Sequence, residues 1–443
     1  EVTWVEGPDF VRQSLPAVGI PSTEDGPSER ATPMREEIRF LRPRNTPKET
    51  TAFTHATVLT MDEAGVLENA TVVVRGNRIE SVLEDGPVPP DAVEIDLTGK
   101  TMIPGLIDVH AHLHYGSREI LPEQPWQYNV NLDFGVTTVM DPSASTDVVF
   151  TQAERVAAGY SVGPRVYSTG YILYGALGNE NAKTPNKDAA YQHVERLKSV
   201  GANSVKVYQQ SQRKQRQWYV EACNTHQILC IAEGGGDLWL NLGMVADGFQ
   251  AIEHALPNAP VYDDVQQFMA ASRTGDTIGL AYSPTLLVAY GGLSGELFFL
   301  KNDDPSNNAR LLRSWDRRDL DAKTFRGDQW TQAGDWNHQQ TARDAASMQE
   351  RGLLVTMGSH GQLQGIAAHW ELWALGGPGA MTPLHALRAA TLDGAKYLGM
   401  DSVLGSITAG KLADMVVLDA DPRDNLQNTA AIHMVVHDGH IRR

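Results

Sequence analysis

Two histidines placed directly after a hydrophobic segment are the first residues in this chain that suggest chemistry. His110 and His112 are two residues apart and follow the apolar stretch at 106–109. Alternate side chains of a β-strand point to the same face, so both imidazoles can chelate one ion. Neutral imidazole is a ligand for Zn, Fe, Ni and Cu. The spacing indicates a metal site, and a solvent-facing His-x-His strand is the ordinary alternative.

Four more residues of suitable chemistry stand within or just after other hydrophobic segments: Lys206, Glu233, His254 and His360. Valines flank Lys206, so on a strand its side chain points the opposite way from theirs, into the interior of a barrel. Each also has a plain structural explanation: a lysine at a barrel rim, an acid at a helix N-terminus, or a histidine bonded within its own turn. If they meet, they predict a centre whose metal lowers the pKa of bound water from about 15.7 to about 7 and polarises a carbonyl.

The segments that carry these residues alternate with helix-length intervals. Such alternation is typical of βαβ units and a parallel sheet, and eight units in about 300 residues fit an α/β fold of the (β/α)8 TIM-like barrel type. The carboxyl ends of barrel strands converge on one mouth, where these side chains would meet. The eight predicted strands are residues 106–109, 136–140, 165–168, 204–208, 228–232, 250–253, 278–282 and 353–357.

The regions outside the predicted barrel are rich in β-branched residues. Residues 51–103 and 404–443 predict a small β-sandwich that is built from both termini, around a barrel at 104–403. Residues 1–50 are rich in Pro, Glu, Arg and Ser and predict an N-terminal extension with one or two short strands at most. The long interval at 284–352 predicts a lid or a subunit contact.

Charge and cysteine content exclude several protein classes. The 443 residues contain 37 Lys and Arg against 54 Asp and Glu, a net charge of −17, which disfavours nucleic acid as a partner. No apolar run reaches membrane-spanning length, so no membrane segment is expected. Cys223 and Cys230 are too few for a disulfide scaffold or a Cys-rich zinc site. The cellular compartment stays open, with a periplasmic or secreted location favoured over a cytoplasmic one.

Several tyrosines lie near the predicted strand ends and are candidates for contact with a substrate. Their position predicts a pocket for an aromatic or apolar small molecule, and packing within the barrel is the alternative. They are Tyr171, Tyr174, Tyr208 and Tyr282, together with Tyr290.

Three stretches of this chain, 102–112, 381–391 and 405–419, carry a family resemblance. In these stretches, and in order over about 50–443, the chain resembles the metal-dependent amidohydrolase superfamily. Within it the chain is similar to the imidazolonepropionase and Xaa-Pro dipeptidase-like branch, and most to members fused to a TolB-like β-propeller. The resemblance implies one or two divalent ions at the barrel mouth, Zn first and Mn, Co or Fe as alternatives. It also implies a small-molecule substrate and a homo-oligomer or a contact with an upstream propeller region.

The ligand positions of the superfamily match four residues of this chain: His110, His112, Lys206 and His254. The resemblance implies that Lys206 is the lysine that is often carboxylated and bridges two metals. Two positions depart from the pattern, because Glu233 stands where the fifth strand usually has His and His360 stands where the eighth usually has Asp. These departures leave the number of metals and the path of the proton open.

The expected activity is metal-dependent hydrolysis of an amide-type C–N bond in a dipeptide, an N-acyl amino acid or a cyclic amide, by metal-activated hydroxide. His360 and His254 are the expected catalytic residues, and His360 would carry the proton to the leaving group. Hydrolysis of esters, lactones or phosphotriesters at the same centre is one alternative. A non-catalytic scaffold with this fold is the other.

Overall fold

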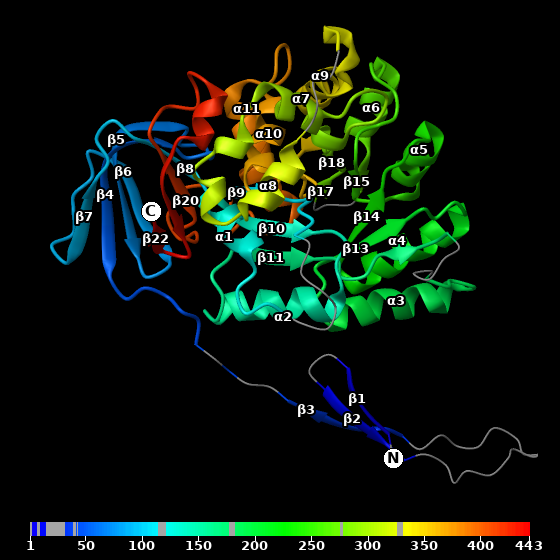
Figure 1. Ribbon diagram of the computed structural model, residues 1–443. Coiled ribbons are helices and arrows are strands. Elements are labelled where there is room, and N and C mark those ends of the chain that lie inside the picture. Colours follow the sequence, from blue (N-terminus) through cyan, green and yellow to red (C-terminus); the bar gives the residue numbers. More distant parts are fainter. Residues whose placement is uncertain are drawn as a thin grey trace, which may run out of the picture.

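The computed structural model describes residues 2–6, 9–14, 32–38, 41, 43–113, 121–176, 182–274, 278–325 and 331–443. Its centre is a set of short parallel strands surrounded by helices, and a β unit lies to one side (Figure 1). The α/β class and the parallel pairing that the sequence predicts are confirmed.

The parallel strands form two sheets rather than one closed ladder. The first has the order β11-β10-β9 and the second the order β12-β13-β14-β15-β18-β19. Backbone hydrogen bonds connect the two at both seams, among them Val109 N to Met357 O at 3.1 Å and Asn203 N to Ser168 O at 3.4 Å. The strands are β9 (Leu106–Asp108), β10 (Val136–Asp141), β11 (Arg165–Ser168), β12 (Leu173–Tyr174), β13 (Ser204–Tyr208), β14 (Leu229–Glu233), β15 (Ala251–Glu253), β18 (Ala281–Ser283) and β19 (Leu354–Val355).

The seventh strand differs from the prediction. Residues 278 and 279 form β17 (Ile278–Gly279), which pairs antiparallel with β16 (Arg273–Thr274) in a separate two-stranded sheet. The parallel strand begins only at Ala281 and continues to Ser283. A continuous apolar run does not mark where one strand ends and the next begins, which explains the shift.

Side chains alternate along the parallel strands between an interior cluster and the layer under the helices. Ile231 and Ala251 pack inside. Val205, Val207 and Ile252 pack outward against the helical layer. This period of two places Lys206 and Glu233 on the interior side of their strands.

Helices follow most strands, and several begin at side-chain caps. Asn186 accepts a hydrogen bond from Ala189 N at 3.0 Å and Asp237 one from Leu240 N at 3.2 Å, as N-cap residues do. The helices are α1 (Trp126–Asp133), α2 (Thr146–Ala157), α3 (Lys187–Ser199), α4 (Arg213–His226), α5 (Leu238–Asp247), α6 (Asp263–Ala271), α7 (Gly295–Asn302), α8 (Arg317–Thr324), α9 (Asn337–Glu350), α10 (Ile366–Leu375), α11 (Pro383–Ala389) and α12 (Leu392–Tyr397), with short 3-10 turns η1 (Leu286–Val288), η2 (Pro305–Asn307), η3 (Leu311–Arg313), η4 (Ala333–Asp335) and η5 (Leu426–Ala430).

The lateral β unit draws strands from both sides of the α/β unit. Its strands form one eight-stranded sheet of order β22-β21-β20-β8-β4-β5-β6, with β7 paired to β4, so a sandwich of two separate sheets is not confirmed. Phe53 and Val72 share its apolar core with Met415 and Val436. The strands are β4 (Thr50–Leu59), β5 (Val66–Arg75), β6 (Arg78–Glu84), β7 (Ala92–Asp96), β8 (Thr101–Pro104), β20 (Met415–Leu418), β21 (Ile432–His437) and β22 (His440–Arg442).

The N-terminal region contains more β structure than the sequence predicts. A three-stranded antiparallel sheet of order β1-β2-β3 lies apart from the other sheets in Figure 1. The one or two strands expected there are therefore an underestimate, because short polar strands such as β3 have no apolar alternation to reveal them. The strands are β1 (Val2–Glu6), β2 (Asp9–Gln13) and β3 (Met34–Glu37).

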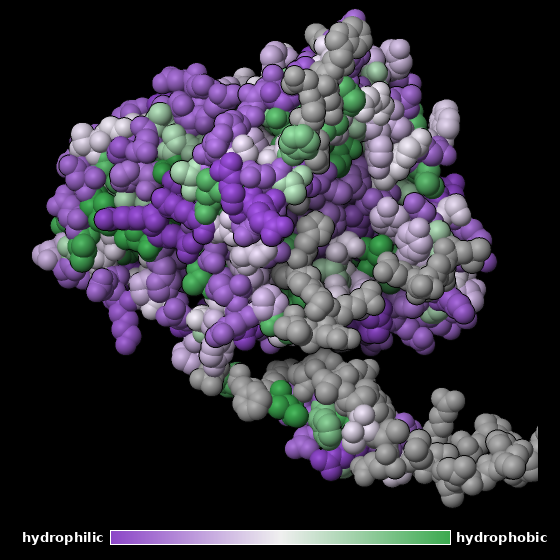
Figure 2. Space-filling view, viewed as in Figure 1, coloured by the Kyte–Doolittle hydropathy of each residue, from purple (hydrophilic) through white to green (hydrophobic). Residues whose placement is uncertain are grey.

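The face shown in Figure 2 mixes hydrophilic and small hydrophobic areas, as on most folded proteins. Among the helices that the structure describes, none has the length and apolar composition needed to cross a bilayer.

Candidate metal centre

His110 and His112 approach each other through their Nε2 atoms, which lie 3.2 Å apart. The Nδ1 atom of His110 is hydrogen-bonded to the Glu253 carboxylate, and both side chains are fully buried. The Nδ1 atom of His112 lies 3.5 Å from Asp141 Oδ1. Carboxylates at Nδ1 fix imidazole orientation and leave Nε2 as the ligand atom, which is the usual arrangement of metal-binding histidine.

This geometry fits a shared cation. If both Nδ1 atoms carry the hydrogen toward their carboxylates, two Nε2 lone pairs face each other at 3.2 Å, which is unfavourable without a positive charge between them. Two nitrogens bound tetrahedrally to Zn at about 2.1 Å are about 3.4 Å apart. The donor set and the spacing therefore suit a divalent ion of the zinc type.

His360 completes a group of three. One ligand atom from each of His110, His112 and His360 lies within 4.8 Å of the others. The ring of His254 is 4.9 Å from that of His110 and 5.0 Å from that of His360. The structure thus brings all four predicted histidines to one point at the carboxyl ends of the strands.

Backbone strain accompanies this convergence. His254 has φ of 71° and His360 has φ of 61°, in the left-handed region that non-glycine residues rarely adopt. The backbone amides of both are held, with His254 N donating to Ser283 O at 2.8 Å and His360 N to His110 O at 2.7 Å. Such conformations persist only where the surroundings enforce them, and they concentrate at functional sites.

Glu233 contacts two other predicted ligands, Lys206 and His254. Its Oε2 atom lies 2.6 Å from Lys206 Nζ, and its Oε1 atom lies 3.0 Å from His254 Nε2. The lysine is buried to 2% exposure, which places its ammonium inside the centre rather than at a rim. The carboxylate compensates that charge and orients His254 at the same time.

Burial controls protonation in the centre. Burial lowers the pKa of His360 to about 2, helped by the neighbouring imidazoles of His112 and His254 and the charge of Lys206, and it holds the pKa of His110 well below its ordinary value. Burial would raise the pKa of Glu233, yet Lys206 and His254 outweigh it and lower that pKa to about 2. Neutral imidazole and ionised carboxylate are the forms that bind metal. The low pKa makes His360 better suited to be a ligand than a base.

A glycine makes room for the centre. A Cβ atom at Gly358 would lie 2.5 Å from Ser283 Oγ and 2.6 Å from His110 Cβ, closer than real contacts allow. The eighth strand segment can therefore approach the first only without a side chain at this position.

Several supporting residues escaped the sequence reasoning. Thr285 Oγ1 lies 2.8 Å from His254 Nδ1, and Glu371 accepts the next two amides, Leu286 N at 2.7 Å and Leu287 N at 3.0 Å. Thr285 itself has φ of 46°, unusual for a β-branched residue. No sequence spacing signals a contact over 85 residues between a loop and α10.

Glu253 and Tyr397 form a second such support. Burial raises the pKa of Glu253 to about 7, against the charge of Lys206, and the Tyr397 hydroxyl donates to its carboxylate. Glu253 could have been predicted from the sequence, because it directly precedes His254. It is also two residues after Ala251 on β15, so its side chain points to the same interior side.

The tyrosines predicted to contact substrate divide into two groups. The Tyr208 ring packs 5.2 Å from that of Tyr174, and burial and the Glu233 carboxylate raise its pKa to about 12. Tyr290 lies 6.2 Å from the His254 ring, and Tyr171 is 42% exposed with its hydroxyl 2.8 Å from Ser145 Oγ. Tyr282 instead points outward into the helical layer at 1% exposure, where its hydroxyl accepts from Leu256 N.

The chain is similar to known proteins in sequence and in fold. Residues 337–442 match the model of the Amidohydrolase family. Over 402 residues the chain is 24% identical to an imidazolonepropionase of Micrococcus luteus, covering 87% of this chain and 94% of that protein.

Solved structures share the fold. A Xaa-Pro dipeptidase with bound methionine in its active site superimposes with a TM-score of 0.68 at 19% identity, over 89% of this chain and 100% of that one. Molinate hydrolase superimposes with a TM-score of 0.66 at 17% identity, over 89% of this chain and 95% of that one.

Proposed function

The chain belongs to the amidohydrolase superfamily and is a hydrolase, and we propose that it cleaves an amide-type C–N bond in a dipeptide, an N-acyl amino acid or a cyclic amide. The names of the similar proteins support the bond type and not a particular substrate. We further propose that the two parallel sheets act as a distorted (β/α)8 barrel with its mouth at the histidines.

One observation carries the proposal: the Nε2 atoms of His110 and His112 converge, while carboxylates hold the Nδ1 atoms of the same two rings. His110 and His112 would hold the ion, with His360 as the third nitrogen ligand. We propose Zn, with Mn, Co or Fe as alternatives. A divalent ion there supplies Lewis-acid activation of water and of the scissile carbonyl.

His254 and Glu233 are proposed to handle the proton. Their 3.0 Å contact is a carboxylate–imidazole pair that faces the centre, and Thr285 holds the far nitrogen. Such a pair can take a proton from the attacking water and pass it to the leaving nitrogen. We assign His360 to metal binding, because its ring lies among the other imidazoles and no carboxylate is hydrogen-bonded to it among the described residues.

Lys206 offers a place for a second ion. Its Nζ atom stands 2.6 Å from Glu233, and its carboxylation would turn this ion pair into two anions able to balance a second metal. We propose that this charge balance is the reason why a glutamate, Glu233, stands at the end of β14.

The substrate is proposed to rest against Tyr174, Tyr208 and Tyr290. Their rings border Glu233 and His254 and offer apolar faces with polar tips, suited to an aromatic or apolar group. Tyr171 lies further out, and Tyr282 is too deeply packed to take part.

The test is metal content together with turnover in the protein and in two variants. His110→Ala should lose both stoichiometric metal and hydrolysis of an amide panel. His385→Ala removes an exposed histidine of α11 and should keep both. Turnover of esters, lactones or phosphotriesters with no amide turnover would replace the proposed bond type. No metal and no turnover in the unaltered protein would indicate a scaffold.

A further inference from the structure

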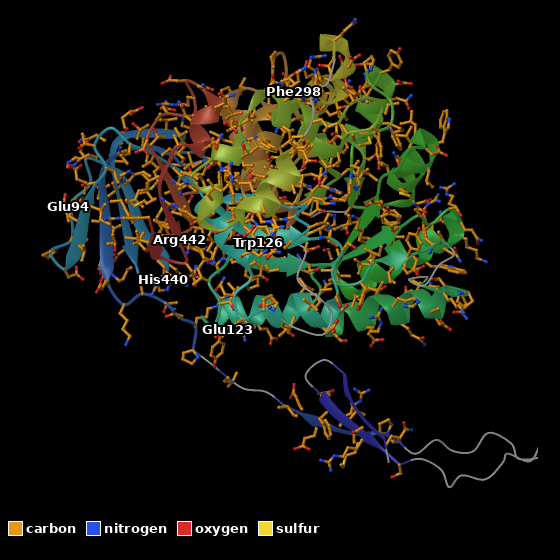
Figure 3. All side chains as sticks on the ribbon, viewed as in Figure 1. Glu94, Glu123, Trp126, Phe298, His440 and Arg442 are labelled. Atoms are coloured by element: carbon orange, nitrogen blue, oxygen red, sulfur yellow. The ribbon has the colours of Figure 1, made fainter. Side chains whose placement is uncertain are left out.

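A basic pocket lies on the opposite side of the α/β unit from the metal centre. It has a volume of about 340 Å³ and is lined by Asn129, Asp133, Arg313, Ser314, Arg442 and Arg443; we call it the arginine pocket. The end of α1 borders it, and α1 ends just before β10 begins, so it lies at the amino-terminal ends of the strands. Arg442 is labelled in Figure 3, where β22 approaches α1.

Positive charge in this pocket exceeds negative charge. Arg442 Nε is 2.6 Å from Asp133 Oδ1, which uses the pocket's one carboxylate side chain. The guanidinium group of Arg310, next to the pocket, donates to two backbone carbonyls, Asp133 O at 3.0 Å and Ile432 O at 2.7 Å. Arg313 makes no ion pair with any residue in the described ranges.

The arginines also repel one another. Burial and the nearby charge of Arg313 lower the pKa of Arg310, with Asp133 opposing this. Figure 2 shows the same part of the face as strongly hydrophilic. In a chain of net charge −17, this pocket has more guanidinium groups than carboxylate side chains in its lining.

We propose that the arginine pocket binds a small dianion of the phosphate or dicarboxylate class and that its occupancy influences the metal centre. Guanidinium groups match planar and tetrahedral oxyanions through paired N–H donors. Asn129 and Ser314 add neutral hydrogen-bonding groups to the lining, and a volume of about 340 Å³ lies within the range of small-molecule sites, roughly 300–1,000 Å³.

A hydrogen-bonded route connects the pocket to a proposed ligand. Two elements that line the pocket converge on Gln364: Asn131 of α1 donates to its Oε1 at 2.9 Å, and Trp315, next to Ser314, donates to its backbone carbonyl at 3.1 Å. Gln364 Nε2 in turn donates to the carbonyl of His112 at 2.7 Å. An anion that shifts α1 or the Ser314 turn would therefore act on His112. This second part rests on the proposed metal centre.

Binding is tested by titration calorimetry with inorganic phosphate at low ionic strength, with succinate as the dicarboxylate arm and chloride as the screening control. Arg313→Gln removes a charge without leaving a buried carboxylate, and should weaken binding at least about tenfold. Arg318→Gln, an exposed arginine on α8, makes the same change in net charge and should leave binding unchanged. Tighter binding of phosphate than succinate, or the reverse, identifies the anion class.

Two results would refute anion binding in the arginine pocket. One is no saturable binding of either anion up to about 10 mM, and the other is binding by Arg313→Gln that equals binding by the unaltered protein. Influence on the centre is tested by chelator competition for Zn with and without phosphate, where a shift of about fivefold or more is expected and should vanish in Arg313→Gln. Phosphate binding without that shift would overturn the influence on His112. Failure to bind Zn at all would refute the proposed function, while the calorimetry still decides the pocket.

Discussion

Replacing Thr285 by valine isolates one hydrogen bond of the metal centre. The hydroxyl lies 2.8 Å from His254 Nδ1, with Thr285 at 0% exposure and His254 at 5%, so water has no access to replace it. Valine keeps the shape and the β-branching, so the strain of the left-handed backbone at φ 46° stays the same. The change therefore removes only the partner of the imidazole.

The expected cost follows from two estimates that agree. A buried donor left without its partner costs about 1–3 kcal/mol. Loss of an outer partner at a metal site lowers metal affinity or activity by about 10–100-fold, which is about 1.4–2.7 kcal/mol. Because this contact is fully buried and His254 is proposed to handle the proton, we expect about 30-fold lower turnover, or about 2 kcal/mol.

The assay is hydrolysis of the amide panel by the zinc-loaded proteins, with thermal unfolding measured in parallel. Thr285→Ser keeps the hydroxyl and should turn over within about threefold of the unaltered protein. Thr356→Val makes the same chemical change at a buried hydroxyl that has no hydrogen-bond partner among the described residues, and should not lower turnover. Equal turnover by Thr285→Val and Thr356→Val would refute the role assigned to Thr285.

Three further outcomes are expected. Gly358→Ala places a Cβ 2.6 Å from His110 Cβ and should lower stability by about 1–3 kcal/mol in urea unfolding; unchanged stability would contradict the close approach. Burial alone would raise the pKa of Asp414, but Arg165 and His437 outweigh burial and lower that pKa. The ionised carboxylate therefore stabilises the fold above the unfolded pKa of about 3.9, and this stabilisation is lost as the pH falls below that value. Asp414→Asn should cost about 3–5 kcal/mol at pH 7 and much less at about pH 2, and an equal loss at both would refute the pairing. Removing metal with a chelator should lower the melting temperature by the linkage of binding to folding, about 2.7 kcal/mol at a metal concentration 100 times Kd, and no shift would argue against a resident ion.

The strands were predictable because local patterns define them. Residues 165–168 and 204–208 match β11 and β13 to the residue. Each contains valine and tyrosine, which favour strands, and each follows a glycine-containing turn. The seventh strand was misplaced because an apolar run at 278–282 contains both a hairpin strand and a parallel one. The terminal sheet was expected from two distant β regions, but the number of layers depends on strand pairing that no local pattern encodes.

The centre was predictable only in its direct donors. Histidine and glutamate at the ends of predicted strands can be recognised as candidate ligands, because parallel strands bring their carboxyl ends together. Thr285, Glu371 and Tyr397 come from a loop and two helices far away in the chain, and their roles depend on tertiary packing. The position of Tyr282, by contrast, could have been predicted. It stands between Ala281 and Ser283 on β18, so its side chain points to the outer face of the strand.

We propose that His110, His112 and His360 hold a catalytic divalent ion. Crystals grown with Zn and measured on both sides of the zinc absorption edge test this proposal. We expect an anomalous peak within about 2.3 Å of the Nε2 atoms of His110 and His112, with His360 as a further ligand. A zinc-loaded crystal with no peak between these imidazoles, or with its peak on other residues, would refute the metal centre.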